Sequence, residues 1–167
     1  PMSQSSLIQA MQQYFAGERS EMTIILCGCA LALLTVLTLY FVQRDGFSKG
    51  LLLTVALGTL IFGSASITIL KRDPPKLQGL VAHAESGASE LAAQSEAQRI
   101  STVISSYKYY RLAAASFTVI AVLLSLLIRV GFWNGVATGL IIMAAAQMTI
   151  DHYSEIRAHR YLSDLTA

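Results

Sequence analysis

The chain has 167 residues, of which 54% are hydrophobic and 13% are charged, and its formal net charge is +2. A soluble domain has roughly 25% charged residues, so this composition argues against a soluble protein. The basic residues are scattered and form no dense stripe that could bind a phosphate backbone, so we expect no nucleic-acid partner.

The charges leave four long uncharged runs, at 22–43, 50–70, 112–128 and 130–150. Each run is close to the roughly 17–25 residues that a membrane-spanning helix needs. We therefore predict an all-α integral membrane protein, with residues 1–167 forming a single membrane domain built as a four-transmembrane-helix bundle. The predicted spans are 22–43, 49–70, 112–129 and 132–150.

A short amphipathic helix closed by Gly17 is predicted over residues 5–16, because apolar side chains recur there at helical spacing. Its polar face is glutamine rather than lysine, which argues against electrostatic binding to anionic lipid. We expect it to lie at the membrane interface or against another helix, and we prefer the interface. The apolar run that follows continues to Val42, so we expect a retained span rather than a cleaved signal peptide.

The second span is expected to end between Lys71 and Lys76, because the adjacent Pro74 and Pro75 cannot continue a helix. Residues 77–111 are rich in Ala, Ser, Gln and Glu and are predicted to form a cytoplasmic helical segment that enters the third span. Its apolar stripe is thin, so this helical segment buries little hydrophobic area by itself. It therefore needs a neighbour to pack against, which could be the N-terminal helix, the C-terminal tail or another subunit. The tail, 151–167, is predicted to extend the fourth span as a cytoplasmic helix.

Aromatic side chains stand where two of the spans begin. Tyrosine and tryptophan are enriched at membrane interfaces because their rings are apolar and their tips are polar. The predicted interface anchors are Tyr107, Tyr109, Tyr110 and Trp133.

Lysine and arginine are distributed unequally between the two sides. Nine lie on the side of the termini (Arg19, Lys71, Arg72, Lys76, Arg99, Lys108, Arg111, Arg157 and Arg160) and three on the side of the tight turns (Arg44, Lys49 and Arg129). By the positive-inside rule, both termini and the 71–111 segment are expected to be cytoplasmic. The expected location is a bacterial inner membrane.

One face of the fourth span carries a residue pattern that repeats every four positions. Its members are Gly131, Gly135, Gly139, Met143 and Gln147. Small residues at this spacing allow two helices to approach closely in lipid, so this is a helix-packing or oligomer face. We favour packing within one subunit. Gln147 is the best intramembrane polar residue, and we expect it to face protein rather than lipid.

The same periodicity continues into a polar group at the membrane edge, formed by Asp151, His152, Glu155 and His159. The two histidines are about 10.5 Å apart by helix rise, so one straight helix cannot bring both to a single metal ion. We favour ion pairs with Arg157 and Arg160, and expect no metal and no cofactor.

The sequence contains no phosphate loop, zinc-ligand motif, nucleophile elbow or paired catalytic carboxylates, which disfavours an enzyme. We expect a non-enzymatic bacterial inner-membrane protein that acts by protein–protein interaction, as an immunity protein or accessory subunit does. In topology alone, the chain resembles bacterial immunity proteins against membrane-acting toxins. The alternative is a homo-oligomeric ion channel or pore, and the third hypothesis is a membrane enzyme or metal-binding protein that uses His152, Glu155 and His159.

Overall fold

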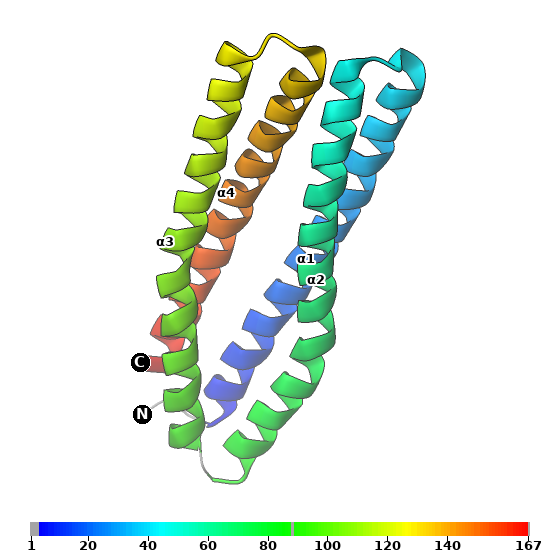
Figure 1. The fold of residues 1–167 in the computed structure, drawn as a ribbon. Helices are drawn as coiled ribbons and strands as arrows, with labels where there is room; N and C mark the ends of the chain where they lie inside the picture. Colours follow the sequence, from blue (N-terminus) through cyan, green and yellow to red (C-terminus); the bar gives the residue numbers. More distant parts are fainter. Residues whose placement is uncertain (1–3, 88, 167) are drawn as a thin grey trace.

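Four long helices account for nearly the whole chain (Figure 1). The computed structural model describes residues 4–87 and 89–166, so Ala167 of the predicted tail lies outside the described residues. The helices are α1 (Gln4–Gln43), α2 (Gly46–Glu85), α3 (Ser89–Leu127) and α4 (Gly131–Thr166). All four are long and apolar enough to cross a membrane.

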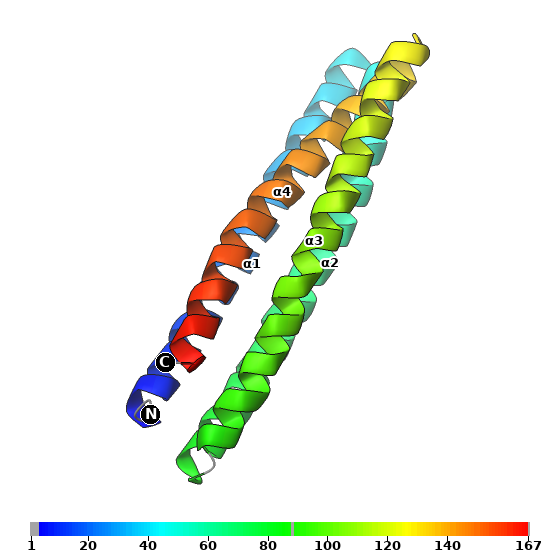
Figure 2. The same cartoon turned by 90° about the vertical axis from the view of Figure 1, so that its left-hand side faces the viewer.

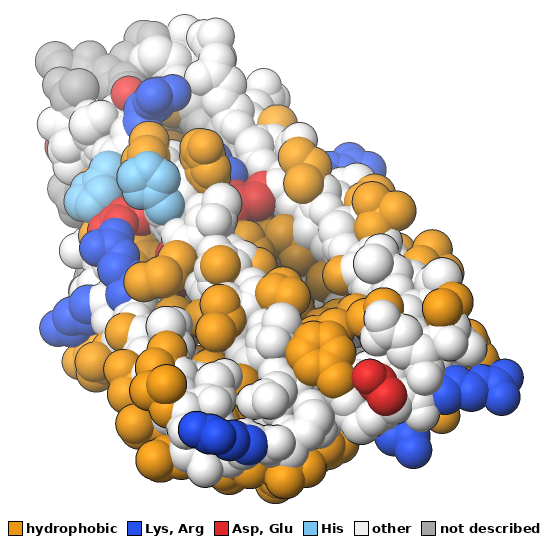
Figure 3. Space-filling view, turned by 90° about the horizontal axis from the view of Figure 1, so that it is seen from above, with side chains coloured by type: hydrophobic (Ala, Val, Ile, Leu, Met, Phe, Trp, Pro, Cys, Tyr) orange, Lys and Arg blue, Asp and Glu red, His pale blue; other side chains and the backbone are white. Residues whose placement is uncertain are grey.

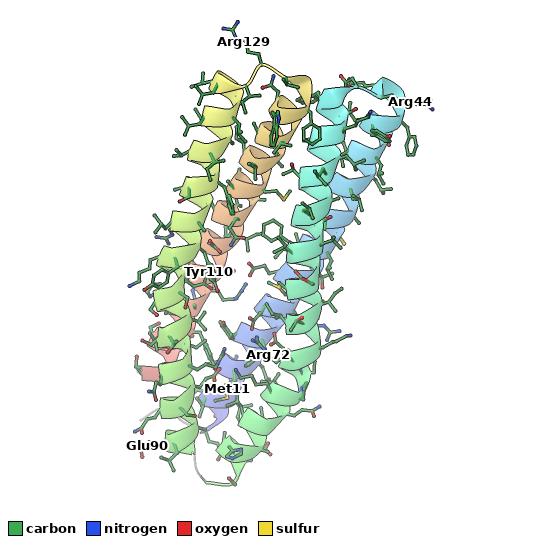
Figure 4. All side chains as sticks on the ribbon, in the orientation of Figure 1. Met11, Arg44, Arg72, Glu90, Tyr110 and Arg129 are labelled. Atoms are coloured by element: carbon green, nitrogen blue, oxygen red, sulfur yellow. The ribbon has the colours of Figure 1, made fainter. Side chains whose placement is uncertain are left out.

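The helices are arranged differently at the two ends of the molecule. At the end that carries Arg44 and Arg129, which we call the turn end, they follow one another in the order α3, α4, α2, α1 (Figures 1 and 4). At the opposite end, which we call the terminal end, α1 crosses toward α4 and α2 leans toward α3 (Figures 1 and 2). The result is two antiparallel hairpins that converge into a four-helix bundle.

Large apolar side chains are exposed along the spans. Leu31, Leu60 and Leu126 are 65%, 69% and 70% exposed. Seen from above, hydrophobic side chains cover much of the outer surface (Figure 3). A soluble monomer rarely exposes such extended apolar surface, whereas a lipid bilayer covers it at no cost.

At the turn end, α2 and α4 pack backbone to backbone through glycines. A Cβ atom added to Gly135 would lie 2.8 Å from the backbone nitrogen of Leu51, and one added to Gly50 would lie 3.0 Å from that of Val136. Small residues permit this approach, and the resulting van der Waals contact holds helices together where lipid supplies no hydrophobic driving force. The glycine face of α4 is thus covered by α2 of the same chain.

The terminal end has its own apolar core, to which all four helices contribute. Buried members include Leu7, Met11, Tyr14 and Phe15 from α1, Ala84 from α2, Ile100 and Tyr107 from α3, and Ala158, Tyr161 and Leu165 from α4. The rings of Tyr14 and Tyr161 stack with centroids 4.3 Å apart. Residues 7–15 of α1 therefore pack against the other helices, and they supply the neighbour that the thin stripe of residues 77–111 needs.

The prediction of a separate N-terminal helix closed by Gly17 is wrong, because α1 runs unbroken from Gln4 to Gln43. Gly17 lies inside this helix and faces Arg157 of α4. A Cβ atom at Gly17 would lie 2.9 Å from Cδ of Arg157. The glycine therefore makes room for the arginine side chain.

The prediction that Pro74 and Pro75 end the helix is also wrong, because α2 continues through both to Glu85. Two prolines remove two backbone hydrogen bonds, those that the carbonyls of Leu70 and Lys71 would accept. These carbonyls lie where the uncharged run 50–70 ends. Beyond the prolines, Ala84 is fully buried in the apolar core of the terminal end, and this packing stabilises the last turns of α2.

Residues 77–111 form parts of two antiparallel helices rather than one segment. The chain reverses after Glu85, and Gly87 adopts φ +87°, a left-handed conformation that favours glycine. From Ser89 to Leu127 the helix is continuous, so the predicted entry of one long helix into the third span is confirmed.

Candidate functional site

Charged and polar side chains from all four helices contact one another beyond the apolar runs, toward the terminal end, and we name this set the polar cluster. Its members are Glu18 and Glu21 from α1, Arg72 and Asp73 from α2, Glu96, Arg99 and Arg111 from α3, and Asp151, Ser154, Glu155, Arg157 and Tyr161 from α4. Asp73, Glu96 and Asp151 are only 4%, 2% and 3% exposed. Charges buried this deeply require partners, so their contacts determine what the cluster can do.

The first group of contacts ties α1 to α4. Arg157 forms an ion pair with Glu21, and the hydroxyl of Ser154 donates a hydrogen bond of 2.5 Å to Oε1 of Glu21. The guanidinium of Arg157 also lies over the Tyr14 ring, 5.7 Å from its centroid. Glu21 thus has two partners on α4, and Arg157 is held on both sides by α1.

The second group involves α3. Arg111 forms an ion pair with Glu155 of α4, which also lies 3.9 Å from Nε2 of His159. Arg99 donates two hydrogen bonds, of 2.5 and 2.8 Å, to the carboxylate of Glu96 one turn earlier on the same helix. The Tyr161 hydroxyl lies 3.5 Å from Glu96, at the limit of a hydrogen bond.

The third group joins α1 and α2, where Arg72 lies between two carboxyl groups. Its guanidinium donates hydrogen bonds of 2.8 and 3.1 Å to Oδ1 of Asp73, and Nη2 lies 3.6 Å from Oε1 of Glu18. The other oxygens, Oε2 of Glu18 and Oδ2 of Asp73, are buried without a hydrogen-bond partner. Burial, and secondarily the nearby Asp73, raise the pKa of Glu18 to about 7.

Asp151 also has a buried carboxyl oxygen without a hydrogen-bond partner, as Glu18, Glu21 and Asp73 do. Nε2 of Gln147 donates a hydrogen bond of 2.6 Å to its Oδ1, while Oδ2 is buried without a partner. Burial raises the pKa of Asp151, although the hydrogen bond from Gln147 opposes this shift. The amide of Gln147 therefore contacts a carboxyl group one turn away on its own helix.

Among the described residues, the polar cluster contains more carboxyl groups than guanidinium groups. Glu21, Glu96 and Glu155 each have an arginine partner, whereas Glu18 and Asp73 share Arg72. Asp151 forms no salt bridge in this part of the structure. The carboxyl groups without an arginine of their own include Glu18 and Asp151, which are those whose pKa is raised.

The predicted polar group at the membrane edge does not form a single site. Glu155 and His159 lie together, and Asp151 faces Gln147, but His152 is exposed and its ring lies 5.6 Å from that of Tyr153. Glu155 is already paired with Arg111. In residues 4–87 and 89–166, no three His, Cys, Asp or Glu side chains are placed to hold one metal ion.

The four predicted interface anchors differ in their surroundings. Tyr109, Tyr110 and Trp133 are 63%, 50% and 41% exposed, as a side chain facing headgroups would be. Tyr107 is 8% exposed and belongs to the core of the terminal end. Burial raises its pKa.

Sequence reasoning missed Glu18, Glu21, Asp73 and Glu96. A signal for two of them was present, since Met11, Tyr14, Glu18 and Glu21 share one helical face by their spacing. Treating residues 5–16 as a separate helix broke this face between Tyr14 and Glu18. For Asp73, the assumption that the prolines end the helix placed the residue at a helix end instead of on a buried helical face.

The raised pKa of Glu18 predicts how stability depends on pH. Between the ordinary value of 4.5 and about 7, the folded chain keeps a proton that the unfolded chain has lost. Stability therefore falls as the pH rises through this window and levels off above it. We expect a higher melting temperature in detergent at about pH 5 than at about pH 8, and a smaller difference in Glu18→Gln.

Glu90→Gln is the matched control, because Glu90 is an exposed acid on α3. This variant should keep the full wild-type difference between the two pH values. An unchanged difference in Glu18→Gln would contradict the assignment to Glu18.

Comparison with known proteins found no matching family model, no matching curated protein and no matching solved structure.

Proposed function

We propose that this chain is a non-enzymatic protein of a bacterial inner membrane that acts by binding another protein, as an immunity protein or an accessory subunit does. An exposed face of α4 just beyond its span carries the proposal. This face presents His152, Tyr153, Ile156 and His159, of which Tyr153 is 65% and Ile156 45% exposed. Aromatic side chains with apolar neighbours are enriched at the centres of protein interfaces.

The backbone behind this face is held by the polar cluster. On the same two turns of α4, Ser154 bonds to Glu21, Glu155 pairs with Arg111, and Ala158 is fully buried. A surface on a fixed backbone loses little conformational entropy on binding. This favours a docking role for the exposed side of α4 while its inner side maintains the bundle.

The proposed orientation places this face in the cytoplasm. It rests on the nine basic residues at the terminal end against three at the turn end. A fluorescent protein fused after Ala167 should then fold and fluoresce, whereas alkaline phosphatase at the same position should be inactive. The opposite pair of results would reverse the orientation.

Site-specific photo-crosslinking tests the docking role. A photoreactive amino acid at position 153 should yield a defined adduct with a second protein in membranes of the native host, and Ile156→Glu should abolish it. Ser163→Glu, further along α4 and also exposed, is the matched control and should retain the adduct. Labelling that is confined to lipid, or that survives Ile156→Glu, would contradict a protein-binding face.

A homo-oligomeric channel is the second candidate, and the low burial of the spans favours it. Only 6% of the most apolar window of α1 and 22% of that of α4 is buried within the chain. A second copy could cover these faces as well as lipid does. However, the hydroxyls of Thr54, Ser64 and Thr68 each donate to a carbonyl of their own helix, so they are not free to replace an ion's water. Conductance in planar bilayers, together with a defined oligomer in detergent, would establish the channel.

A further inference from the structure

A groove of about 230 Å³ lies between α1 and α2 beside the carboxyl pair of Glu18 and Asp73. Its walls are mostly apolar and include Phe15, Leu70, Pro74 and Leu77. Two ionisable side chains, Arg19 and Asp73, also line it. The groove thus combines a hydrocarbon surface with one cationic and one anionic group.

Asp73 lines this groove, and one of its carboxylate oxygens is buried without a hydrogen-bond partner. Its side chain is 6% exposed. Arg72 donates hydrogen bonds to Oδ1 of Asp73, and Oδ2 has no hydrogen-bond partner. A buried carboxylate oxygen without a donor costs free energy until a donor reaches it. Because one arginine serves both Asp73 and Glu18, an additional cation would also balance the charge.

Arg19 supplies the complementary group. It is exposed at the edge of the groove and forms no salt bridge among the described residues. Guanidinium groups bind phosphate through paired, charge-assisted hydrogen bonds. The position also fits a lipid, because Leu70 is the last residue of the uncharged run 50–70, so the groove opens where the hydrocarbon core gives way to headgroups.

We propose that this groove binds an aminophospholipid, whose ammonium group donates to Oδ2 of Asp73 and whose phosphate accepts from Arg19. The glycerol and the first part of one acyl chain lie along Phe15, Pro74 and Leu70 and lead into the membrane. A choline lipid has the same phosphate and the same positive charge but no N–H donor. The headgroup nitrogen therefore determines which lipid is retained.

The raised pKa of Glu18 is consistent with this occupant. An ammonium ion between the two carboxyl groups would favour their charged forms and lower that pKa. In the absence of the lipid, a proton on Glu18 relieves the same crowding of negative charge.

Native mass spectrometry of the full chain in mixed micelles tests the proposal. The probes are phosphatidylethanolamine, its N-methyl and N,N-dimethyl derivatives, and phosphatidylcholine, all with the same acyl chains. Losing a charge-assisted hydrogen bond should weaken retention about tenfold from the first lipid to the last, with the largest fall at the final methylation. Equal retention across the series in the wild-type chain would overturn the proposal.

Two variants examine the acidic group and the apolar wall separately. Asp73→Asn should abolish the preference for ethanolamine over choline, and Asp164→Asn, an exposed acid, should leave it unchanged. Ala16→Phe fills the groove without altering charge and should weaken retention of the whole series, whereas Ala82→Phe on the exposed side of α2 should not. If Asp73→Asn does not fold, the methylation series and Ala16→Phe decide the matter.

Soluble glycerophosphoethanolamine distinguishes a lipid from a free metabolite. It carries the same headgroup without acyl chains, so it should not displace the bound lipid at equal concentration. Displacement at equal concentration would overturn the assignment to a membrane lipid, as would an ethanolamine preference that survives in Asp73→Asn.

Discussion

Gly135→Ala is expected to destabilise the folded chain by about 1–3 kcal/mol, because overpacking at a close helix contact forces the backbones apart. The added Cβ would collide with the carbonyl oxygen of Phe47 and would lie 2.8 Å from the backbone nitrogen of Leu51. Both obstacles are backbone atoms, so no side-chain rotation relieves the clash. Denaturation in detergent, followed by circular dichroism, measures the loss.

Gly50→Ala should behave in the same way, since its Cβ would meet the backbone of Phe132 and Val136. The matched control is Gly79→Ala, at a helical glycine with no atom within 4 Å of the added Cβ. That variant should stabilise the chain by about 0.5–1 kcal/mol, because alanine suits a helix interior better than glycine. Equal effects at positions 79 and 135 would show that helix propensity, and not the α2–α4 contact, sets the result.

The spans were predictable because charge and apolar length are properties of the sequence alone. Four uncharged runs predicted four helices, and each run lies, to within a residue at one end, in an observed helix that is long and apolar enough to cross a membrane. The repeat at Gly131, Gly135 and Gly139 indicated a close helix approach without identifying the opposing helix. Its counterpart is Gly46 and Gly50 on α2, a short motif that is hard to distinguish from ordinary turn glycines.

The continuity of the helices beyond the spans was not predictable from local rules. Gly17 and Pro74 are normally read as helix ends, yet tertiary packing overrides both. Gly17 is tolerated because Arg157 lies against it, and the prolines because Ala84 anchors the residues that follow. These contacts join residues far apart in sequence, so no single window contains them.

The same limit applies to the polar cluster. By helical spacing, Leu91 would continue the apolar stripe of Leu77, Leu80 and Ala84, but the reversal at Gly87 changes the helical phase and leaves Leu91 70% exposed. Ala92, Glu96 and Ile100 are buried instead. Glu96 lies well before the uncharged run 112–128, where an acidic residue is ordinarily solvated. Its burial depends on α4, which places the Tyr161 hydroxyl beside it.

Arg157→Ala is expected to destabilise the chain by about 3 kcal/mol, because removing one member of a largely buried ion pair leaves the other charge uncompensated. Glu21 is 14% exposed and would keep only the Ser154 hydroxyl as a partner. Arg160→Ala removes an exposed arginine one turn away and should change stability by no more than about 0.5 kcal/mol.

A double-mutant cycle with Glu21→Ala separates the ion pair from the packing of the arginine stem against Gly17. If the charges interact as the structure shows, the double variant should be more stable than the sum of the single effects predicts, by about 1–3 kcal/mol. Additive effects would mean that Arg157 contributes only by packing across α1 and over Tyr14. In that case, the contact between α1 and α4 would depend on the stacked rings of Tyr14 and Tyr161 rather than on charge.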